Sequence, residues 1–528
     1  MTATIDPKFE LTEAQSKKLP KGKKLRFHLT YTKRPNGDVY VISNATYTGK
    51  DKKDKVRTMF VGSKLLGRFV DGDQTTLVST RPRNWKALAL AEETAAAVEE
   101  AIDKVEDATS QFSSTEIETV QGLIKFVREN IRQNDGEEPW AVVRYNREHI
   151  YLVAVLCAIH GGFDAPSIAD YWNRHGAELA QCIPHFRNER ISEDTVWKVL
   201  CTTPESVNSA LLKNMYYSLV NLSTLRFIGL DGQVARASRN EETGLPFQLA
   251  GVYDSVTKLW IDHIRIEAKT NEIPTFPALV ETLDLHNTIV TADALNTVTP
   301  LAEAILRRGG HYCLAVKDNK GGLADAIKDH FTNQTWLKRD AKTVFDDPHT
   351  SHGRRECRDY FFLPASRLIG FTEKWPELAE GTICMIKHYS VEQRKRWSQL
   401  DNKTVQAEKS KAESEEVRYY ISSLKFNDPN TPETYARAIR SHWGIESAHY
   451  ILDVDFGQDW QQCKLPTYLI TTSTLRKIAT NFLQMILRAG GTEVSESSLI
   501  RLSRNLDRPI QTLKAIAKAC PQINSKAQ

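Results

Sequence analysis

The sequence has no long apolar run, no paired-cysteine motif and no large excess of one charge. No stretch of about eighteen apolar residues occurs, so no membrane-spanning helix is expected. The eight cysteines are scattered without a Cys-x-x-Cys pair, which argues against a zinc site and against a disulfide framework. The start of the chain, residues 1–18, contains no apolar signal core, so we expect a cytoplasmic protein.

Length and composition describe an ordinary globular protein. With 528 residues, the chain is long enough for about two to four domains. A hydrophobic content of 41% with 26% charged residues is typical of such proteins. The net charge of +4 is too small to indicate a nucleic-acid partner by itself, so the distribution of charge matters more.

Positive charge is concentrated near the N-terminus. Residues 17–57 contain thirteen Lys or Arg and three acidic residues. Alternating apolar residues predict strands over 26–34 and 39–47 around an Asn-Gly turn, and a third strand over 57–62. We assign residues 1–75 to a basic β module. It is either a solvated β-meander or a β-ribbon whose lysines grip DNA phosphates.

Helical patterns follow. Residues 76–112 read as a helical linker, and residues 113–220 as a helical domain that begins with a Ser113–Glu116 capping box. Ser192 is placed to cap a helix with an apolar side, and the helix before it makes a possible helix-turn-helix pair. The alternative is a small helical bundle without DNA contact. The predicted phosphate contacts here are Arg187, Arg190 and Lys198.

From Leu225 the pattern changes to strands and then to alternating helices and strands. The predicted strands cover 225–231, 247–254, 259–266, 287–293 and 311–318, and the predicted helices cover 275–285 and 300–307. Three antiparallel strands followed by alternating helix and strand indicate an α/β domain. We expect Glu272, with Lys269 and Asn271, to cap the helix that follows.

Three acidic residues occupy positions where a charge needs compensation. Asp231 and Asp293 each end an apolar strand, and Glu446 lies in a helical stretch, 437–459, among core-facing residues. Singly, the aspartates are explained as turn residues and the glutamate as half of a salt bridge. Together, two carboxylates on strand ends and one on a helix across the sheet form an oxygen-ligand set suited to Mg²⁺ or Mn²⁺.

At these residues the sequence resembles insertion-sequence transposases of the Asp-Asp-Glu type, in particular the H-repeat-associated branch. The resemblance covers roughly residues 115–490. Two departures are Gln233, where the family usually has lysine, and Ser447–Tyr450, where a sequence ending in His-Trp is more common. The matching pieces, in the family's order, are LDGQ (230–233), EAKTNEIPTFPALVETLDL (267–285), TADALNT (291–297), RRGGHYCLAVKDNK (307–320), SHGRRECR (351–358), YYISSL (419–424) and IRSHWGIESAHYILDVDF (439–456).

The resemblance implies a ribonuclease-H-like catalytic domain, in which Asp231, Asp293 and Glu446 bind two Mg²⁺ ions. Two such ions about 3.5–4 Å apart would activate a water and stabilise the leaving oxygen, so that a 3′-OH is freed and then joined to target DNA. It also implies a bacterial, nucleoid-associated protein that acts as a homodimer on terminal inverted repeats. A nuclease without strand transfer and a non-catalytic DNA-binding regulator are the alternatives.

The interval between Asp293 and Glu446 is too long for a compact fold and predicts a β-rich insertion over 336–425 with a charged loop near 391–416. The catalytic domain then comprises 221–335 and 426–490, followed by a C-terminal helical segment, 491–528. An amphipathic helix is expected from residue 467 onward. The predicted DNA contacts in these regions are Lys317, Asn319, His352, Arg354, Arg355, Arg396, Trp397 and His442, with His442 and His449 alternatively supporting the metal ligands.

Overall fold

The computed structural model consists of two units, Met1–Ala96 and Ala97–Gln528. The described residues are 26–33, 39–50, 56–69, 114–134, 145–183, 185–239, 244–267, 272–317, 322–346, 349–351, 354–392, 414–490, 496–506 and 508–521.

The first unit contains the predicted β-meander. Strands β1 (Arg26–Lys33), β2 (Val39–Lys50) and β3 (Val56–Phe69) form an antiparallel sheet in the order β1-β2-β3. Lys33 pairs with Val39, so β1 and β2 form a hairpin as the sequence predicted. β3 is longer than expected. The Asn-Gly turn lies outside the described residues, and the phosphate-gripping role of this module stays a prediction.

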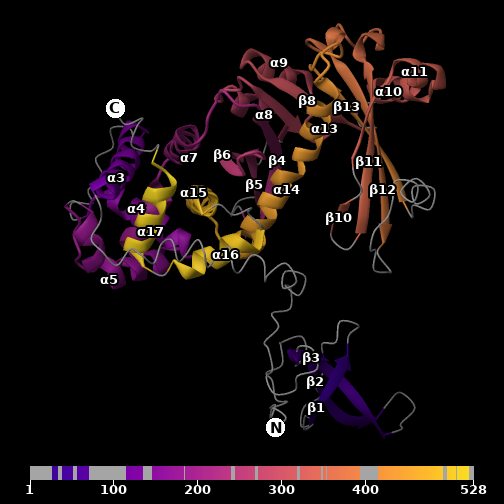
Figure 1. Cartoon of the computed structure of the whole chain (residues 1–528). Coiled ribbons are helices and arrows are strands. Elements are labelled where there is room, and N and C mark those ends of the chain that lie inside the picture. Colours follow the sequence, from indigo (N-terminus) through magenta and orange to yellow (C-terminus); the bar gives the residue numbers. More distant parts are fainter. Residues whose placement is uncertain are drawn as a thin grey trace. The chain divides into compact units, whose positions relative to one another are not determined.

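The second unit is built on a mixed sheet that begins with three antiparallel strands, β4 (Arg226–Arg239), β5 (Pro246–Asp254) and β6 (Leu259–Ile266). Strand β7 (Thr288–Ala292) pairs in parallel with β4, and β8 (His311–Val316) pairs in parallel with β7 (Figure 1). The first strand therefore lies inside the sheet, between β5 and β7. This is the ribonuclease-H-like α/β arrangement that the sequence predicted.

The predicted β-rich insertion extends the same sheet instead of forming a separate one. Its strand β13 pairs antiparallel with β8, so the order runs β10-β11-β12-β13-β8-β7-β4-β5-β6, with β9 paired to β11. Figure 1 shows these strands continuing from β8 in the same sheet. The strands are β9 (Lys342–Phe345), β10 (His349–Ser351), β11 (Arg354–Pro364), β12 (Thr382–Glu392) and β13 (Ser414–Ser422).

Helices cover both faces of the sheet because alternate strand residues point to opposite sides. Ile228 of β4 packs in one core with Leu301 of α9, whereas its neighbour Phe227 packs in another core with Tyr435 of α13. The helices that flank the sheet and the insertion are α8 (Glu272–Val280), α9 (Thr299–Arg307), α10 (Gly322–Thr332), α11 (Gln334–Asp340) and α13 (Thr431–Ser441), with short 3-10 turns at Ala365–Arg367 and Leu378–Glu380.

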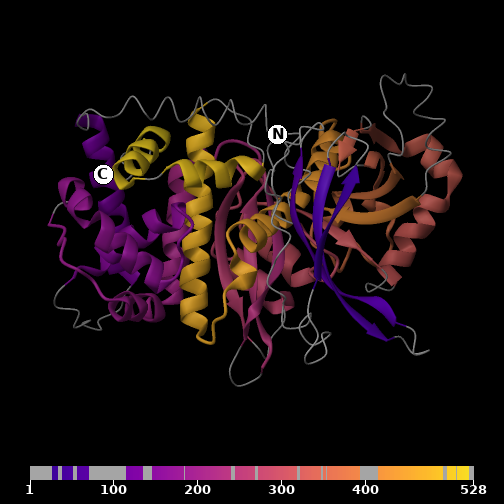
Figure 2. The same cartoon turned by 90° about the horizontal axis from the view of Figure 1, so that it is seen from below.

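Helix α15 (Pro466–Ala489) joins the helical region to the sheet, and Figure 2 shows it standing between them. The helix predicted from residue 467 onward is confirmed, but the exposed side that an amphipathic pattern implies is missing, because almost every residue from Leu469 to Leu487 is buried. The helix packs against β6 on one side and against α4 and α7 on the other, so it has no solvent face. The remaining helices are α3 (Ser114–Asn134), α4 (Arg147–Ile159), α5 (Ala165–Cys182), α6 (Glu193–Thr202), α7 (Glu205–Leu219), α16 (Glu496–Asn505) and α17 (Pro509–Ala519).

The candidate helix-turn-helix pair consists of α5 and α6. The Ser192 side chain accepts a hydrogen bond from the Thr195 backbone N–H, which confirms the predicted cap. Residues 183–192 separate the two helices, a longer connection than the turn of about three or four residues in helix-turn-helix readers. Within the described residues, no helix is long and apolar enough to cross a membrane.

Candidate active site

Asp231 and Asp293 lie side by side on neighbouring strands. Leu230 of β4 pairs with Ala292 of β7, so the two aspartates occupy the next position on parallel strands, with Cα atoms about 5 Å apart. Asp293 directly follows β7, as the sequence predicted. Asp231 does not end its strand, because β4 continues to Arg239 while paired with β5.

Both aspartates share the sheet face that is covered by helix α14 (Trp443–Tyr450). The alternation of side chains along β4 puts Gly229 and Asp231 on one face. Gly229 is in close contact with Ile445, since a Cβ added there would lie 3.0 Å from the Ile445 Cγ2 atom. A larger residue at 229 would therefore push α14 away from the sheet. Because Gly229 has no side chain, α14 can approach the acidic residues.

One side of α14 and of the π-helical turn after it (Ile451–Asp455) lies along β4, so that residues about one turn apart on the helix contact alternate residues of the strand. The His449 Nδ1 atom lies 3.4 Å from the Asp231 Oδ2 atom. One turn later, the Gln233 Nε2 atom donates to the Asp453 Oδ1 atom at 2.7 Å. Gln233, the departure from the family's usual lysine, thus ties the central strand to the end of this helix.

Glu446 is carried by the same helix, between His442 and His449, and the residue is partly exposed. Partial burial, and next the charge of Asp231, raise the pKa of the Glu446 carboxyl, while Arg418, His449 and Lys317 act in the opposite direction. Glu446 therefore lies close enough to Asp231 for the two charges to interact, and it is carried by the helix that covers the sheet face of both aspartates.

His442 and His449 are turned into the protein beside these acids. The His442 Nδ1 atom lies 3.0 Å from the Thr291 Oγ1 atom, and burial lowers the pKa of this imidazole. His449 packs against Trp260, with ring centroids 5.3 Å apart. His449 thus contacts Asp231, whereas His442 contacts Thr291, and the choice between DNA contact and support of the acids stays a prediction for both residues.

A fourth acid, Glu272, was not predicted to belong to this group. It is the first residue of α8, and its Oε1 atom occupies the space that a Cβ at Gly232 would need. The buried Asn296 amide donates to Glu272 Oε2 and to Asp293 Oδ1, both at 2.8 Å. Burial raises the pKa of Glu272, and the charges of Asp293 and Asp231 raise it further, against the opposing hydrogen bond from Asn296.

Among the described residues, no three His, Cys, Asp or Glu side chains are gathered closely enough to form a metal-binding group. The residues nevertheless fit a divalent cation by their chemistry. Burial raises the pKa of both Glu272 and Glu446, and neighbouring carboxylates raise it further, so an added cation would relieve a repulsion that is already present. Carboxylate oxygens are also the ligands that Mg²⁺ prefers.

Only some of the predicted DNA contacts belong to the part of the chain that the structure describes. Lys317 is exposed just after β8, and Lys198 and Arg190 are exposed on and before α6. Arg354 and Arg355 belong to β11, of which only the backbone is described at these two positions. Asn319, His352, Arg396 and Trp397 lie outside the described residues.

Comparison with known proteins agrees with the sequence motifs. Residues 230–482 match the family described as transposase DDE domain. "H repeat-associated putative transposase YhhI" of Escherichia coli K12 is 28% identical over 363 residues, which cover 67% of this chain and 90% of that protein. "Putative transposase YncI" of Escherichia coli O157:H7 is 25% identical over 372 residues, covering 69% and 88% of the two chains.

Among solved structures, a synaptic complex of piggyBac transposase with hairpin DNA matches 78% of this chain and 77% of its own at 12% identity, with a TM-score of 0.29 that is too low to support an argument. Residues 230–482, which include Asp231, Asp293 and Glu446, match the transposase DDE domain family, and the chain is similar over two thirds of its length to H repeat-associated transposases.

Proposed function

We propose that this protein cleaves DNA at the ends of an insertion element and joins the freed 3′-OH to target DNA. The observation that supports this most strongly is that Asp231 and Asp293 occupy neighbouring positions on parallel strands, on the sheet face covered by α14, the helix that carries Glu446. Residues that serve only the fold would not need to bring like charges together.

Each of the three residues has a defined part. Asp231 and Asp293 present carboxylates from adjacent strands, and Glu446 completes the set from α14. Divalent cations held by these residues, Mg²⁺ or its substitute Mn²⁺, would supply Lewis acidity for attack on a phosphodiester. His449 and Asn296 hold Asp231 and Asp293 in place through the contacts described above.

DNA would approach this edge along the exposed Lys317, whose charge also reaches Glu446. Because two element ends must be cut and joined together, a homodimer on DNA is the expected assembly. Double-stranded DNA with terminal inverted repeats is the expected substrate. The basic β module and the α5–α6 region would add contacts to phosphates.

The direct test is a cleavage and strand-transfer assay with Mg²⁺ and the DNA that flanks this gene. We expect nicked or excised element ends and joined products. Asp231→Asn, Asp293→Asn and Glu446→Gln should each abolish cleavage while DNA binding persists. Near-wild-type cleavage by any one of these variants would overturn the assignment of that residue. Cleavage without joined products would instead identify a nuclease.

A further inference from the structure

The side-chain amide of Gln233 is held at both of its polar atoms by the segment that follows α14. Its Nε2 atom donates to the Asp453 Oδ1 atom at 2.7 Å, and its Oε1 atom accepts from the Gln458 Nε2 atom at 3.1 Å. Gln233 is 5% exposed and Gln458 is 0% exposed. A buried side chain two positions after Asp231 on β4 is therefore fixed in one orientation from beyond the helix that carries Glu446.

The chain reverses its direction between these two contacts with Gln233. The π-helical turn Ile451–Asp455 closes with a hydrogen bond from the Phe456 backbone N–H to the Ile451 carbonyl at 3.0 Å. Gly457 then has a φ of +66°, a left-handed conformation that is costly for residues with a side chain. Single π-helical turns are frequent at functional sites. This reversal lets one short segment contact the same glutamine twice.

The hydrogen bonds that reach Gln233 all run in one direction. The Lys477 Nζ atom donates to the Ser473 Oγ atom at 2.8 Å, and the Ser473 hydroxyl donates to the Gln458 Oε1 atom at 3.2 Å. From Gln458 the bonds continue through Gln233 to the Asp453 carboxylate. Aligned hydrogen bonds strengthen one another, and a carboxylate accepts more strongly than a neutral oxygen. The chain thus anchors the end of the catalytic helix to the buried helix α15.

The contact between Gln233 and Asp453 sets the register of α14 on β4 more firmly than the contact before it. The His449 Nδ1 atom lies 3.4 Å from the Asp231 Oδ2 atom, beyond the usual hydrogen-bond range of about 2.7–3.2 Å. A cation bound by Asp231 would also weaken the attraction of this carboxylate for His449. Gln233 and Asp453 are not proposed cation ligands, so their hydrogen bond would remain when the cation binds.

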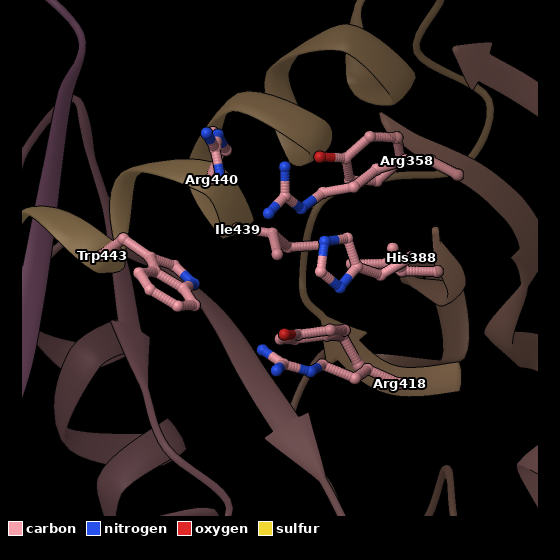
Figure 3. Close-up of a pocket in the computed structure, with 9 residues that line it drawn as sticks. Arg358, His388, Arg418, Ile439, Arg440 and Trp443 are labelled. Carbon is pink, nitrogen blue, oxygen red and sulfur yellow. The ribbon is translucent and has the colours of Figure 1, made fainter. Parts of the chain in front are cut away.

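The start of α14 borders open space. His442, just before the helix, is held by Thr291 at 3.0 Å. The next residue, Trp443, is 46% exposed and lines a pocket between the insertion and the helices, and Figure 3 shows it across this pocket from His388. A helix held only at this end would be able to pivot toward the pocket. The hydrogen bonds of Gln233 at the other end oppose such a movement.

We propose that Gln233 is a positioning residue for DNA cleavage. Its amide, held from two sides, sets the register of α14 and thereby places Glu446 relative to Asp231. This deepens the proposed function and rests on it. Slippage of α14 by one residue would move Glu446 by about 1.5 Å along the helix axis and turn it by about 100°. A misplacement of about 1 Å can lower a reaction rate about 100-fold.

The test separates the cleavage rate from DNA affinity, with the full chain and the DNA that flanks the gene. Gln233→Met keeps a side chain of similar volume and removes both hydrogen bonds. At saturating DNA in Mg²⁺, it should lower the single-turnover cleavage rate about 10–100-fold. DNA affinity in EDTA should stay at the wild-type value. A lower urea midpoint with an unchanged rate per folded molecule would indicate a purely structural role and overturn the proposal.

An exchange of the two partners tests the hydrogen bond itself. Gln233→Glu places two carboxylates against each other and should cleave no faster than Gln233→Met. In Gln233→Glu/Asp453→Asn the new amide donates to the new carboxylate and the total charge is that of the wild type, so most of the lost rate should return. If the double variant has the wild-type urea midpoint and still cleaves as slowly as Gln233→Glu, the hydrogen bond does not position the helix.

The matched control is Gln248→Glu. Gln248 lies on β5, paired with Val234 of β4, and it is exposed, so this change adds the same charge one strand away. Its cleavage rate and its DNA affinity should equal those of the wild type. A loss of cleavage as large as that of Gln233→Glu would attribute the effect to charge instead of register and would contradict the proposal.

Mn²⁺ binding supplies a readout that does not require cleavage. Free Mn²⁺ is followed by electron paramagnetic resonance while each variant is titrated without DNA. Gln233→Met should bind Mn²⁺ about tenfold more weakly or worse, and the exchanged pair should recover. If these changes occur while the wild type neither cuts nor joins DNA, the proposed function fails and the positioning role stands. Unchanged Mn²⁺ affinity in Gln233→Met would reject the positioning role, whatever the wild type does to DNA.

Discussion

Two polar clusters in this protein differ in how deeply their charges are buried and in whether those charges are paired. The acidic edge consists of Asp231, Asp293, Glu272 and Glu446. The α15 network consists of Asp262 and His263 of β6 with Lys477 of α15 and their partners. In the network, charge is buried and paired. At the acidic edge, carboxylates are partly exposed, and their like charges interact.

The α15 network is satisfied almost completely within the protein. Asp262 is 0% exposed, receives a hydrogen bond from Ser209 at 2.9 Å and lies 3.3 Å from the Lys213 ammonium group. Lys477 donates to Ser473 at 2.8 Å, and His263 is 2.8 Å from Thr474. Burial with full pairing indicates a structural role, whereas like charges gathered at a sheet edge indicate a site that binds a cation.

The largest expected effect is on catalysis at the acidic edge. Asp231→Asn should reduce DNA cleavage about 10³-fold or more, because several kcal/mol of cation-dependent stabilisation would be lost. Its melting temperature without metal should stay equal or rise, since one repelling charge is removed. Mg²⁺ should raise the melting temperature of the wild type and not that of the variant. Asp325→Asn, at a mostly exposed position of α10, is the control.

A substitution in the α15 network should lower the stability of the protein and leave its cleavage activity unchanged. Asp262→Ala leaves Lys213 and Ser209 without their shared partner in a buried site, so we expect a loss of about 3–5 kcal/mol in the free energy of unfolding. A urea titration at neutral pH measures this loss. Cleavage per folded molecule should remain close to the wild-type value. A variant with unchanged stability would remove the distinction between the two clusters.

Glu272 is expected to have an intermediate effect. Glu272→Gln should lower cleavage about 10–100-fold, as is usual for groups that orient metal ligands. Gly232→Ala should act in the same direction, because its Cβ would displace the Glu272 carboxyl. Gly322→Ala, whose Cβ would make only an ordinary contact with Phe371, serves as control. Full activity in Glu272→Gln would show that this acid is not part of the site.

The smallest effect concerns pH. Burial lowers the pKa of Lys477 to about 7, so between this value and its usual 10.5 the unfolded chain binds the proton that the folded chain lacks. The Lys477 contribution to stability should therefore rise as pH increases from 7 toward 10. The groups around it are His263, Ser473, Trp260, Asp262, Asp453 and Arg476.

The stability difference between Lys477→Met and the wild type isolates this contribution. We expect the variant's relative advantage to be largest near pH 7 and to shrink toward pH 10, as measured by urea midpoints at each pH. A difference that stays constant with pH would show that Lys477 keeps its proton in the folded protein.

The sequence predicted the sheet well where turns bound the strands. β6 has the predicted bounds, and Asp293 stands at the strand end as expected, because an apolar run stopped at a charged residue. β4 was predicted to end at Asp231, yet it continues because β5 pairs with it through Ala235. The length of β4 was therefore decided by its pairing with another segment, and the local sequence pattern does not reveal such pairing.

The remaining features depended on tertiary contacts. Glu272 joins the acidic edge only because Gly232 has no side chain, a relation between two segments that appear unconnected in sequence. Thr471 to Thr474 in α15 gave the helix a polar appearance, but burial between β6 and α4 removed its solvent face.

The most direct measurement is diffraction from crystals soaked in Mn²⁺, with data collected at the manganese absorption edge. We predict anomalous peaks at the sheet edge, within coordination distance of the carboxylates of Asp231, Asp293 and Glu446, in a chain otherwise folded as described. Manganese bound elsewhere, with the Glu446 carboxylate remote from both aspartates, would contradict the account.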